Sequence, residues 1–350
     1  MKALSEIDKN FIPATLGNHE YLFRDCREEP FRLYGLILPN EEDPHFMRLP
    51  SKVASTVNGG VLSLASCTAG GRIRFRTDSP SVAIRTKMHN IYHGDHFPMT
   101  GSAGFDLYAD GVYRNTFRPP FDVKDGFDSC VDLKEKKMRD ILIHMPLYSG
   151  VISLEIGVEP GSQLLPGDEY KYTTPVVYYG SSITQGGCAS RPGMCYHNVL
   201  ARRLNRDFWC LGFSGNALGE DAIAQYIAGL DMSIFVYDYD NNAPTVEHLR
   251  DTHEKMFRTI RQAQPDLPIL ILPRPKYSLT EEEWERQRVI RKTYENALAA
   301  GDKNVYFIDS QTLMALCKED GLVDDGHPTD FGFASMANAI GDALEQIINK

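Results

Sequence analysis

Two features of the sequence, a serine after an apolar run and a distant aspartate–histidine pair, could together carry out a hydrolytic reaction. The serine belongs to the stretch Tyr179-Gly180-Ser181-Ser182-Ile183-Thr184-Gln185-Gly186, which follows the apolar residues 173–178. That run is rich in β-branched and aromatic residues, as a buried parallel strand should be, and a serine at its carboxyl end would lie in the crevice where open α/β sheets bind ligands. Taken alone, a Ser-rich turn between a strand and a helix more often caps the helix.

Asp324 and His327 are the second feature, and they lie three residues apart on the Gly-containing loop 321–330. A hydrolytic serine needs a base that accepts its proton and a carboxylate that holds the base in the right tautomer. An acidic surface loop with an isolated histidine is the simpler interpretation of this loop by itself. Combined with the serine turn, and with the strand–helix pattern between them, the pair favours a Ser-His-Asp hydrolase.

Four short blocks, taken in order, resemble the SGNH, or GDSL-type, hydrolase family. Residues 180–184 (Gly-Ser-Ser-Ile-Thr) are similar to its first block, Gly-Asp-Ser-Leu-Thr, with serine in place of aspartate, and residues 324–327 match its last block, Asp-x-x-His. Residues 211–216 resemble the second block. Residues 238–244 fall where the family has Gly-x-Asn-Asp, but the glycine is missing, so Asn241 and Asn242 are both candidates for the equivalent asparagine. The Ala-Pro that follows and begins the next helix favours Asn242.

The resemblance implies a role for each matched residue. Ser182 would be the nucleophile, His327 the base and Asp324 the residue that orients the base. The backbone N–H groups of Ser182 and Gly215, with the side chain of Asn242, would hold the oxyanion. The implied fold is a three-layer α/β/α domain with a parallel sheet, and no cofactor and no metal are expected.

The substrate follows less directly, because the family includes carbohydrate deacetylases, lipases, thioesterases and acyltransferases, and a fold does not choose among them. The loops near the serine are polar and offer no long apolar lid for a fatty chain. This favours a small acyl group, such as acetyl, on a carbohydrate or similar polar molecule. A lipid or thioester acylhydrolase or acyltransferase is the alternative. An inactive carbohydrate-binding protein is another, although it would have no need of Ser182, Asp324 and His327 together.

The first half of the chain has the pattern of an antiparallel β protein. From about residue 52 to 160 apolar residues recur at every second position without helical stretches, and residues 104–113 contain the Asp-Gly pair of a type I′ hairpin. Gly104-Phe105-Asp106-Leu107-Tyr108 resembles the Gly-x-Asp-Leu-Tyr signature of an N-terminal β-sandwich found ahead of some SGNH hydrolases. We therefore expect a jelly-roll-like sandwich over 1–165 and the hydrolase domain over 172–350, with a linker at 161–174. The arginine row of residues 72–76 is expected on a solvated face.

Beyond the linker the pattern alternates between strands and helices, which predicts a parallel sheet wrapped by helices. Apolar strands are expected at 173–179, 208–213, 234–237, 268–272 and 305–308. Helices are expected at 196–204, from 246 to about 260 and over 333–347. Thr280-Glu281-Glu282-Glu283 has the form of a capping box that begins one more helix.

The composition excludes several classes of protein. A formal net charge of −10 argues against binding to nucleic acid or to an anionic membrane surface, since both need a basic patch. No apolar run approaches the ~20 residues that cross a bilayer. Residues 1–9 lack the apolar stretch of a signal peptide, so we expect a cytoplasmic protein, or a secreted one whose signal has been removed. The expected partner is a small-molecule or oligosaccharide ester, and a homo-oligomer is compatible with the sequence.

Several other side chains are candidates for the site. Arg191 and Arg274 could hold a polar or anionic substrate group, with an ordinary ion pair as the alternative for each. His93 and His96 are expected to reach over the crevice and help bind substrate, which we favour over a metal site that would also include His89. The seven cysteines are scattered, which suggests reduced thiols, and Cys188 near the serine is expected to pack as a small hydrophobic residue rather than to react.

Overall fold

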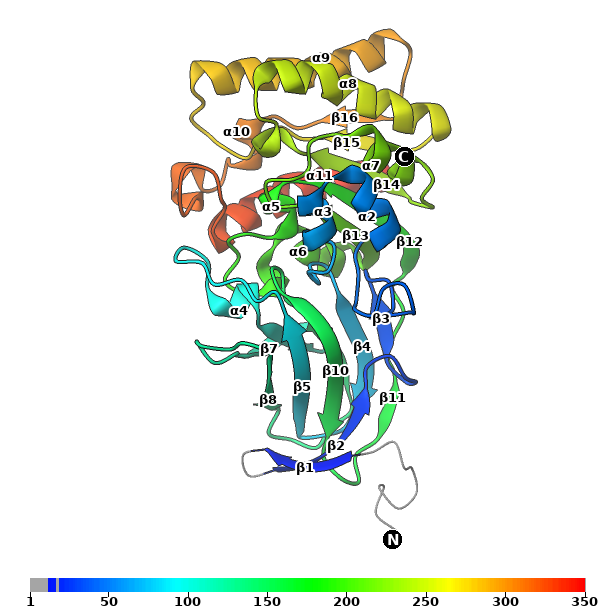
Figure 1. Ribbon diagram of the computed structural model, residues 1–350, viewed down its shortest axis with the longest axis vertical. Coiled ribbons are helices and arrows are strands. Elements are labelled where there is room, and N and C mark those ends of the chain that lie inside the picture. Colours follow the sequence, from blue (N-terminus) through cyan, green and yellow to red (C-terminus); the bar gives the residue numbers. More distant parts are fainter. Residues whose placement is uncertain (1–11, 17–18, 350) are drawn as a thin grey trace. The chain divides into compact units, whose positions relative to one another are not determined.

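The computed structural model describes residues 12–16 and 19–349, which form two compact units (Figure 1). Of these described residues, the first unit contains those up to Met47, Ser66–Glu169 and Ser190–Gly193. The second contains Arg48–Ala65, Tyr170–Ala189 and the described residues from Met194 onward. The predicted domain boundaries are continuous in sequence, whereas these units exchange segments, so the boundaries stay a prediction. Residues 1–9, considered above for a signal peptide, lie outside the described residues.

The first unit is a sandwich of two antiparallel sheets, as expected. One sheet has the order β1 (Ile12–Leu16), β2 (His19–Asp25), β10 (Gly150–Val158), β5 (Ser81–His89) and β8 (Gly126–Asp132). The other has the order β11 (Leu164–Pro166), β4 (Arg72–Thr77), β9 (Arg139–His144), β6 (Phe105–Ala109) and β7 (Val112–Phe117), and β3 (Arg32–Tyr34) pairs with β4. Alternate residues of both sheets, such as Ile73, Phe105, Ile84 and Leu154, meet in one buried cluster.

The hairpin between β6 and β7 turns at Asp110 and Gly111, whose φ angles are 53° and 76°. A type I′ turn requires a positive φ at both central residues, so the Asp-Gly prediction is confirmed.

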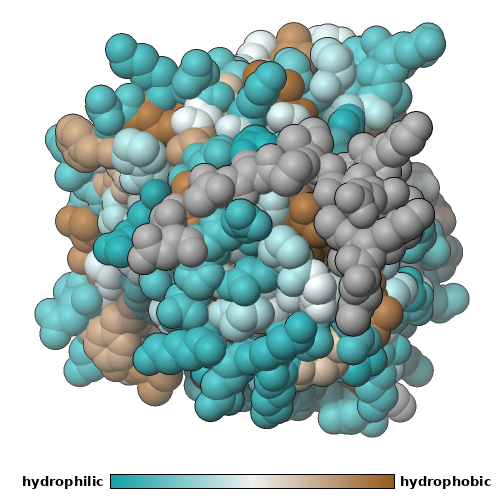
Figure 2. Space-filling view, turned by 90° about the horizontal axis from the view of Figure 1, so that it is seen from below, coloured by the Kyte–Doolittle hydropathy of each residue, from teal (hydrophilic) through white to brown (hydrophobic). Residues whose placement is uncertain are grey.

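In the space-filling view of Figure 2, which faces the molecule from below, hydrophilic residues predominate and the hydrophobic ones are scattered between them.

Three details of the N-terminal half differ from the sequence prediction. The arginine row of β4 is not a solvated face, because Arg72 is fully buried and Arg74 forms an ion pair with Asp140 at 2.8 Å. Residues 52–160 are not free of helices, since they include most of α2 (Ser51–Val57) and all of α3 (Gly59–Leu64) and α4 (Met99–Ser102). The expected linker contains β11, which pairs with β4.

The second unit contains a five-stranded parallel sheet with the order β13 (Arg206–Gly212), β12 (Tyr172–Gly180), β14 (Ile234–Asp238), β15 (Ile269–Ile271) and β16 (Val305–Phe307). The connection from β12 to β13 runs in the direction opposite to the next three connections. Because such crossovers are right-handed, the helix of the first connection must lie on one face of the sheet and the helices of the others on the opposite face. The result is the expected α/β/α arrangement of three layers.

The helices follow this rule. One layer contains α6 (Tyr196–Leu204) and α11 (Asp330–Ile348), and the other contains α7 (Asp221–Ala228), α8 (Val246–Ala263) and α9 (Glu281–Ala299). Figure 1 shows α8 and α9 side by side, near β15 and β16. Shorter elements are α5 (Ser182–Gln185), α10 (Ser310–Leu313) and the 3₁₀ turns η1 (Pro192–Met194), η2 (Asp240–Asn242) and η3 (Lys318–Gly321). In the part of the chain that the structure describes, no helix is both long and apolar enough to span a membrane.

Arg48 belongs to the second unit although it precedes most of the sandwich in sequence. Its guanidinium is fully buried and donates to the carbonyl oxygens of Cys210 (3.1 Å), Gly212 (2.6 Å) and Leu64 (2.7 Å). Two of these carbonyls belong to the end of β13. Helices α2 and α3 follow Arg48, and Asn58 between them donates to the carbonyl oxygen of Asn216 at 3.1 Å. This segment therefore supports the loop that follows β13.

Candidate active site

The serine turn lies where β12 ends and α5 begins. Ser181 is the N-cap of α5, and its hydroxyl oxygen accepts the N–H of Ile183 at 3.2 Å. A Cβ atom on Gly180 would lie 2.0 Å from the carbonyl oxygen of Asp238 on β14, so only glycine allows the two strands to approach this closely. Ser182 is the first residue of the helix, and its side chain lies at the carboxyl edge of the sheet, where the sequence analysis placed it.

Ser182, His327 and Asp324 lie in a line of hydrogen-bonded side chains. Ser182 Oγ is 2.9 Å from His327 Nε2, and His327 Nδ1 is 2.8 Å from Asp324 Oδ2. The chain thus brings together three residues that are separated by up to 145 positions. These contacts allow the imidazole to accept the serine proton through one nitrogen while a carboxylate holds the other nitrogen as a donor.

Hydrogen bonds favour the ionised form of the Asp324 carboxylate. Its partial burial acts to raise the pKa, but the backbone N–H groups of His327 (2.7 Å) and Gly326 (2.8 Å) donate to Oδ1, and these bonds with the His327 ring lower the pKa to about 2. A negative charge beside Nδ1 favours the imidazolium that forms when the histidine accepts a proton.

The loop after β13 carries the other predicted groups. The Phe213 N–H donates to the Gly180 carbonyl oxygen at 2.8 Å, which joins this loop to the serine turn, and Gly215 has a φ of 68° that favours glycine. Asn242, the last residue of η2, donates through Nδ2 to the Phe213 carbonyl oxygen (2.9 Å), and its Oδ1 accepts the Gly215 N–H (3.2 Å). Two of the three predicted oxyanion donors, Gly215 and Asn242, therefore lie side by side. The Gly215 N–H is bonded to Asn242, whereas the amide of Asn242 has a second N–H.

Asn241 differs from Asn242 in its surroundings. Its amide nitrogen is buried and has no hydrogen-bond partner among residues 12–16 and 19–349. A pocket of about 330 Å³ is lined by residues from all of these loops, namely Ser182, Ile183, Ser214, Gly215, Asn241, Asn242, Gly326 and His327. Most of these residues are polar or glycine, as the absence of an apolar lid from the sequence indicated.

The two asparagines can be separated by experiment. We expect Asn242→Ala to lower kcat by roughly 10²- to 10³-fold with little change in KM, because an oxyanion donor acts mainly in the transition state. Its stability should also fall, since two hydrogen bonds to the 213–215 loop are lost. Asn241→Ala should leave the melting temperature and kcat close to those of the parent. Steady-state kinetics and thermal unfolding of both variants measure this, and a kcat loss confined to Asn241→Ala would move the donor one residue back.

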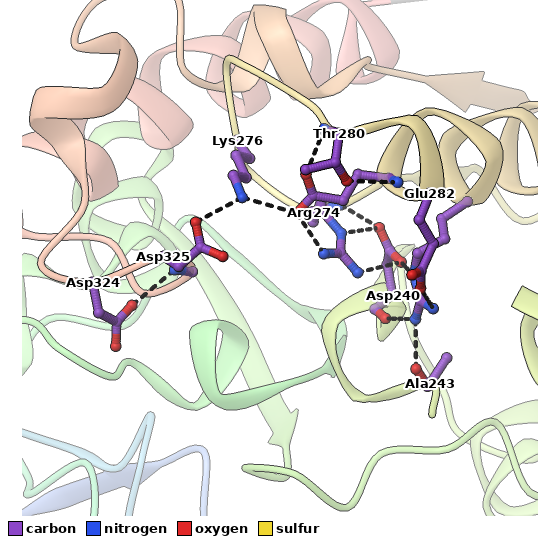
Figure 3. Close-up of polar contacts among 11 residues, drawn as sticks. Asp240, Ala243, Arg274, Lys276, Thr280, Glu282, Asp324 and Asp325 are labelled. Carbon is purple, nitrogen blue, oxygen red and sulfur yellow. Dashed lines mark hydrogen bonds and ion pairs between the residues drawn. The ribbon is translucent and has the colours of Figure 1, made fainter. Parts of the chain in front are cut away.

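Arg274 lies at the carboxyl edge of the sheet, as predicted, but its guanidinium is engaged by protein carboxylates. It donates to Asp240 through Nε (3.0 Å) and to Glu283 through Nη1 (2.9 Å). Glu283 also accepts from Lys276 (3.0 Å), and Lys276 in turn donates to Asp325 (2.8 Å), the neighbour of Asp324. Figure 3 shows these contacts as a continuous series from Asp240 to Asp325. The geometry favours the ion-pair alternative over substrate binding for Arg274.

The remaining candidates belong to the first unit. Arg191 donates to Asp106 (2.7 Å) and to the hydroxyl of Tyr108 (2.8 Å), two residues of the Gly-x-Asp-Leu-Tyr signature, and its guanidinium lies 3.7 Å from the ring centre of Tyr113. The signature thus holds a stretch of chain that begins eight residues after Ser182. His93 and His96 lie on the segment after β5, and His96 Nδ1 is 3.0 Å from Asp95. Substrate binding by Arg191, His93 and His96 stays a prediction.

Cys188 is a buried thiol, as expected. Burial first, and the charge of Asp324 second, raise its pKa to about 12, so the thiolate that a nucleophile requires is disfavoured.

A larger cavity of about 630 Å³ lies between the ends of α8 and α9, but its lining contains no serine, cysteine or histidine and hence no nucleophile–base pair.

The sequence did not predict the charged residues that hold the loops around the site: Asp240, Arg286, Lys276 and Arg48. One signal was available in α9, where Glu283, Arg286 and Gln287 lie on the same buried face as Ile290. Charged residues on the inner face of a helix indicate buried partners. The identity of those partners depends on pairing between distant segments, which has no local pattern.

Comparison with known proteins supports this description. The chain is similar to a protein from Bacteroides ovatus described as a GDSL-like lipase, with 27% identity, a TM-score of 0.84 and coverage of 94% of this chain and 98% of the other. It shares its fold with the salicylyl-acyltransferase SsfX3 of a tetracycline biosynthetic pathway (19% identity, TM-score 0.75, coverage 94% and 98%). It also shares its fold with the acetyl xylan esterase Est2A of the rumen bacterium Butyrivibrio proteoclasticus (10% identity, TM-score 0.60, coverage 94% and 99%). No curated protein sequence matches the chain.

Two family models cover most of the sequence. Residues 21–164 match the GxDLY model, which describes the N-terminus of esterases of the SGNH hydrolase type. Residues 173–348, about half of the chain, match the model of the GDSL-like lipase/acylhydrolase family. With the SGNH-type fold in place, these matches confirm the resemblance read from the four blocks, and the chain belongs to the GDSL-like lipase/acylhydrolase family.

Proposed function

We propose that this protein is a serine esterase that removes a small acyl group, such as acetyl, from a carbohydrate or a similar polar substrate. The observation that carries the proposal is the hydrogen-bonded line from Ser182 through His327 to Asp324, which opens on a small and mainly polar pocket. A nucleophile, a base and an ionised carboxylate in this order are what acyl transfer to a serine requires.

In the proposed reaction, Ser182 Oγ forms a bond to the ester carbonyl carbon while its proton passes to His327 Nε2. The tetrahedral intermediate then collapses, the bond to the alcohol oxygen breaks, and His327 gives that oxygen the proton. Water attacks the acyl-enzyme by the same route and releases the acid and Ser182. Asp324 keeps the imidazole oriented and stabilises its positive charge throughout.

The oxyanion of the tetrahedral intermediate would be held by the N–H group of Ser182, by the second N–H of the Asn242 amide and by the N–H of Gly215. The Gly215 N–H donates to Asn242 Oδ1 at 3.2 Å in the structure, so it would have to exchange or share that bond when the oxyanion forms. Ser182 begins α5, and N–H groups in the first turn of a helix point out of its N-terminus, where a negative charge is stabilised. Loss of one such donor costs roughly 3–4 kcal/mol in other hydrolases.

The substrate class rests on the size and polarity of the pocket. A volume of about 330 Å³ suits a small ligand, and the lining has Ile183 as its one hydrophobic member. The shared fold with an acetyl xylan esterase, and with a family two carbohydrate esterase from Clostridium thermocellum in complex with cellohexaose, supports the same class.

The proposal predicts how activity depends on acyl length. For p-nitrophenyl esters from acetate to octanoate, kcat/KM should fall steeply, because a mainly polar lining offers the extra methylenes little apolar surface to bind. In a fitted apolar channel, each additional buried methylene would instead strengthen binding of the acyl chain by about 0.8 kcal/mol. Release of acetate from acetylated oligosaccharides is the second measurement. A kcat/KM that rises along the series would favour a lipid or thioester acylhydrolase.

An acyltransferase remains the closest alternative, since it would use the same acyl-enzyme and differ only in the acceptor. Adding polar alcohols to the p-nitrophenyl acetate assay tests this, because transfer to the alcohol raises the yield of the new ester at the expense of free acetate. A protein that only binds carbohydrate would show neither product.

A further inference from the structure

A buried carboxylate lies at the start of the turn that carries Asn241 and Asn242. Asp240, the first residue of η2, is fully buried. Its carboxylate accepts the backbone N–H (3.0 Å), Nε (3.0 Å) and Nη2 (3.2 Å) of Arg274 and the Nε of Arg286 (2.9 Å). Burial alone would raise the pKa of Asp240, but the two arginines hold it below its usual value, so the carboxylate stays charged.

Arg286 reaches the same turn from α9 and contacts its backbone on both sides of the asparagines. Through Nη2 it donates to the carbonyl oxygen of Asp240 (2.7 Å) and to that of Ala243. Figure 3 shows Asp240 and Ala243 at the end of the series of polar contacts that lies away from Asp325. One planar guanidinium therefore fixes the residue before Asn241 and the residue after Asn242.

A buried ion pair between an arginine and a carboxylate can serve stability alone. The partners of Arg286 therefore decide whether it also positions the site. The Arg286 side chain is 4% exposed. Its Nη1 lies 3.5 Å from Glu282 on the same helix, while its Nε and Nη2 donate to residues 240–243 at 2.9 Å or less. Asn242 lies between the two clamped residues, and its side chain bonds Phe213 and Gly215. Movement of the clamped backbone would thus shift Asn242 relative to Ser182.

We propose that Arg286, with Asp240, is a positioning residue that sets the place of the Asn242 amide for the transition state. This inference rests on the proposed function. Lysine cannot replace arginine here, because a single ammonium does not reproduce the planar fork that reaches a carboxylate and two carbonyls at once. A misplacement by about 1 Å can lower a catalytic rate by roughly 10²-fold.

The test is Arg286→Lys in the full chain, assayed with p-nitrophenyl acetate. We expect kcat to fall roughly 10- to 100-fold, less than for loss of an oxyanion donor, while KM changes by less than about threefold. In an Asn242→Ala background the same substitution should lower kcat by less than about threefold, because the group it positions is already absent. An equal loss in both backgrounds would overturn the inference.

Arg261 supplies a matched control. It donates to the carboxylate of Asp302 (2.8 Å) and to the carbonyl oxygens of Leu267 (2.6 Å) and Asn304 (3.2 Å), which precede β15 and β16 at the amino edge of the sheet. Arg261→Lys should lower the melting temperature without lowering kcat. Equal kcat losses in Arg261→Lys and Arg286→Lys would show a general structural effect and contradict the proposal.

If Arg286→Lys does not fold, Asp240→Asn serves as the second variant, since it keeps the shape of the side chain and removes the charge that holds both arginines. It should show the same kcat loss and the same dependence on Asn242, and a normal kcat would overturn the inference. Failure of the proposed function is distinguishable, because it would appear as activity that survives Ser182→Ala.

Discussion

Ser182→Ala is expected to lower kcat for p-nitrophenyl acetate by roughly 10⁶-fold, the loss seen when a serine hydrolase loses its nucleophile. The hydroxyl lies 2.9 Å from His327 Nε2 and lines the pocket, so its removal leaves no other group in place to form the acyl-enzyme. The melting temperature should change little, because one hydrogen bond at the edge of a pocket is lost and no packed carbon is removed. Initial rates and thermal unfolding of the purified variant measure both quantities.

Ser181→Ala is the control, and it should show the opposite pattern. Ser181 is fully buried and caps α5 through its bond to the Ile183 N–H, so its loss should cost about 1 kcal/mol of stability. Its hydroxyl has no part in the line to Asp324, so most of the activity should remain. A dead Ser181→Ala together with an active Ser182→Ala would place the nucleophile one residue earlier.

Asp238→Asn is expected to stabilise the protein, and by more as the pH rises from 4 to 8. Asp238 is buried at the end of β14, and its carboxylate accepts a hydrogen bond from the Thr184 hydroxyl at 3.4 Å. Burial first, and the charge of Asp240 second, raise its pKa from 3.8 to about 8. Between these values the folded chain keeps a proton that the unfolded chain releases, so unfolding becomes more favourable with rising pH.

The contribution has a slope of at most about 1.4 kcal/mol per pH unit, and it is absent below pH 4 and constant above pH 8. Urea unfolding of the parent and of Asp238→Asn at several values of pH measures it as a difference in free energy that grows toward pH 8. Asp240→Asn is the matched comparison. Its native carboxylate is held charged by two arginines, so this variant should lose stability at every pH above 4. A pH-independent difference for Asp238→Asn would contradict the raised pKa.

Local sequence signals predicted much of the second unit. The helix at 196–204 has the predicted bounds. The capping box at Thr280 is present, with the Thr280 N–H 2.8 Å from Glu283 Oε2. These elements depend on neighbours within four residues, and such neighbours are visible in the sequence. The serine turn and the Asp324–His327 loop were found for the same reason, since each is a short block.

Features that depend on distant residues were not predicted. The arginines of β4 alternate like a solvated face, yet Arg72 is buried. Gly35, a residue that is distant in sequence, lies so near that a Cβ atom on it would be 2.8 Å from Arg72 Nη2. Arg274 was placed at the correct edge, but its partner Asp240 lies 34 residues away and the contact has no signature. The same holds for Arg48 and its carbonyl partners, 16 to 164 residues away.

The position of Arg48 also limits how this chain can change in evolution. The segment Arg48–Ala65 belongs to the second unit but lies between two stretches of the first. Recombination that replaced everything before residue 170 would bring an unrelated domain in front of an intact sheet but would also delete Arg48. The carbonyls of Cys210 and Gly212 would then lose a buried donor, at a cost of about 1–3 kcal/mol each. An exchange of the first unit that keeps the second one stable should therefore retain the segment Arg48–Ala65, so a single break at residue 170 is disfavoured.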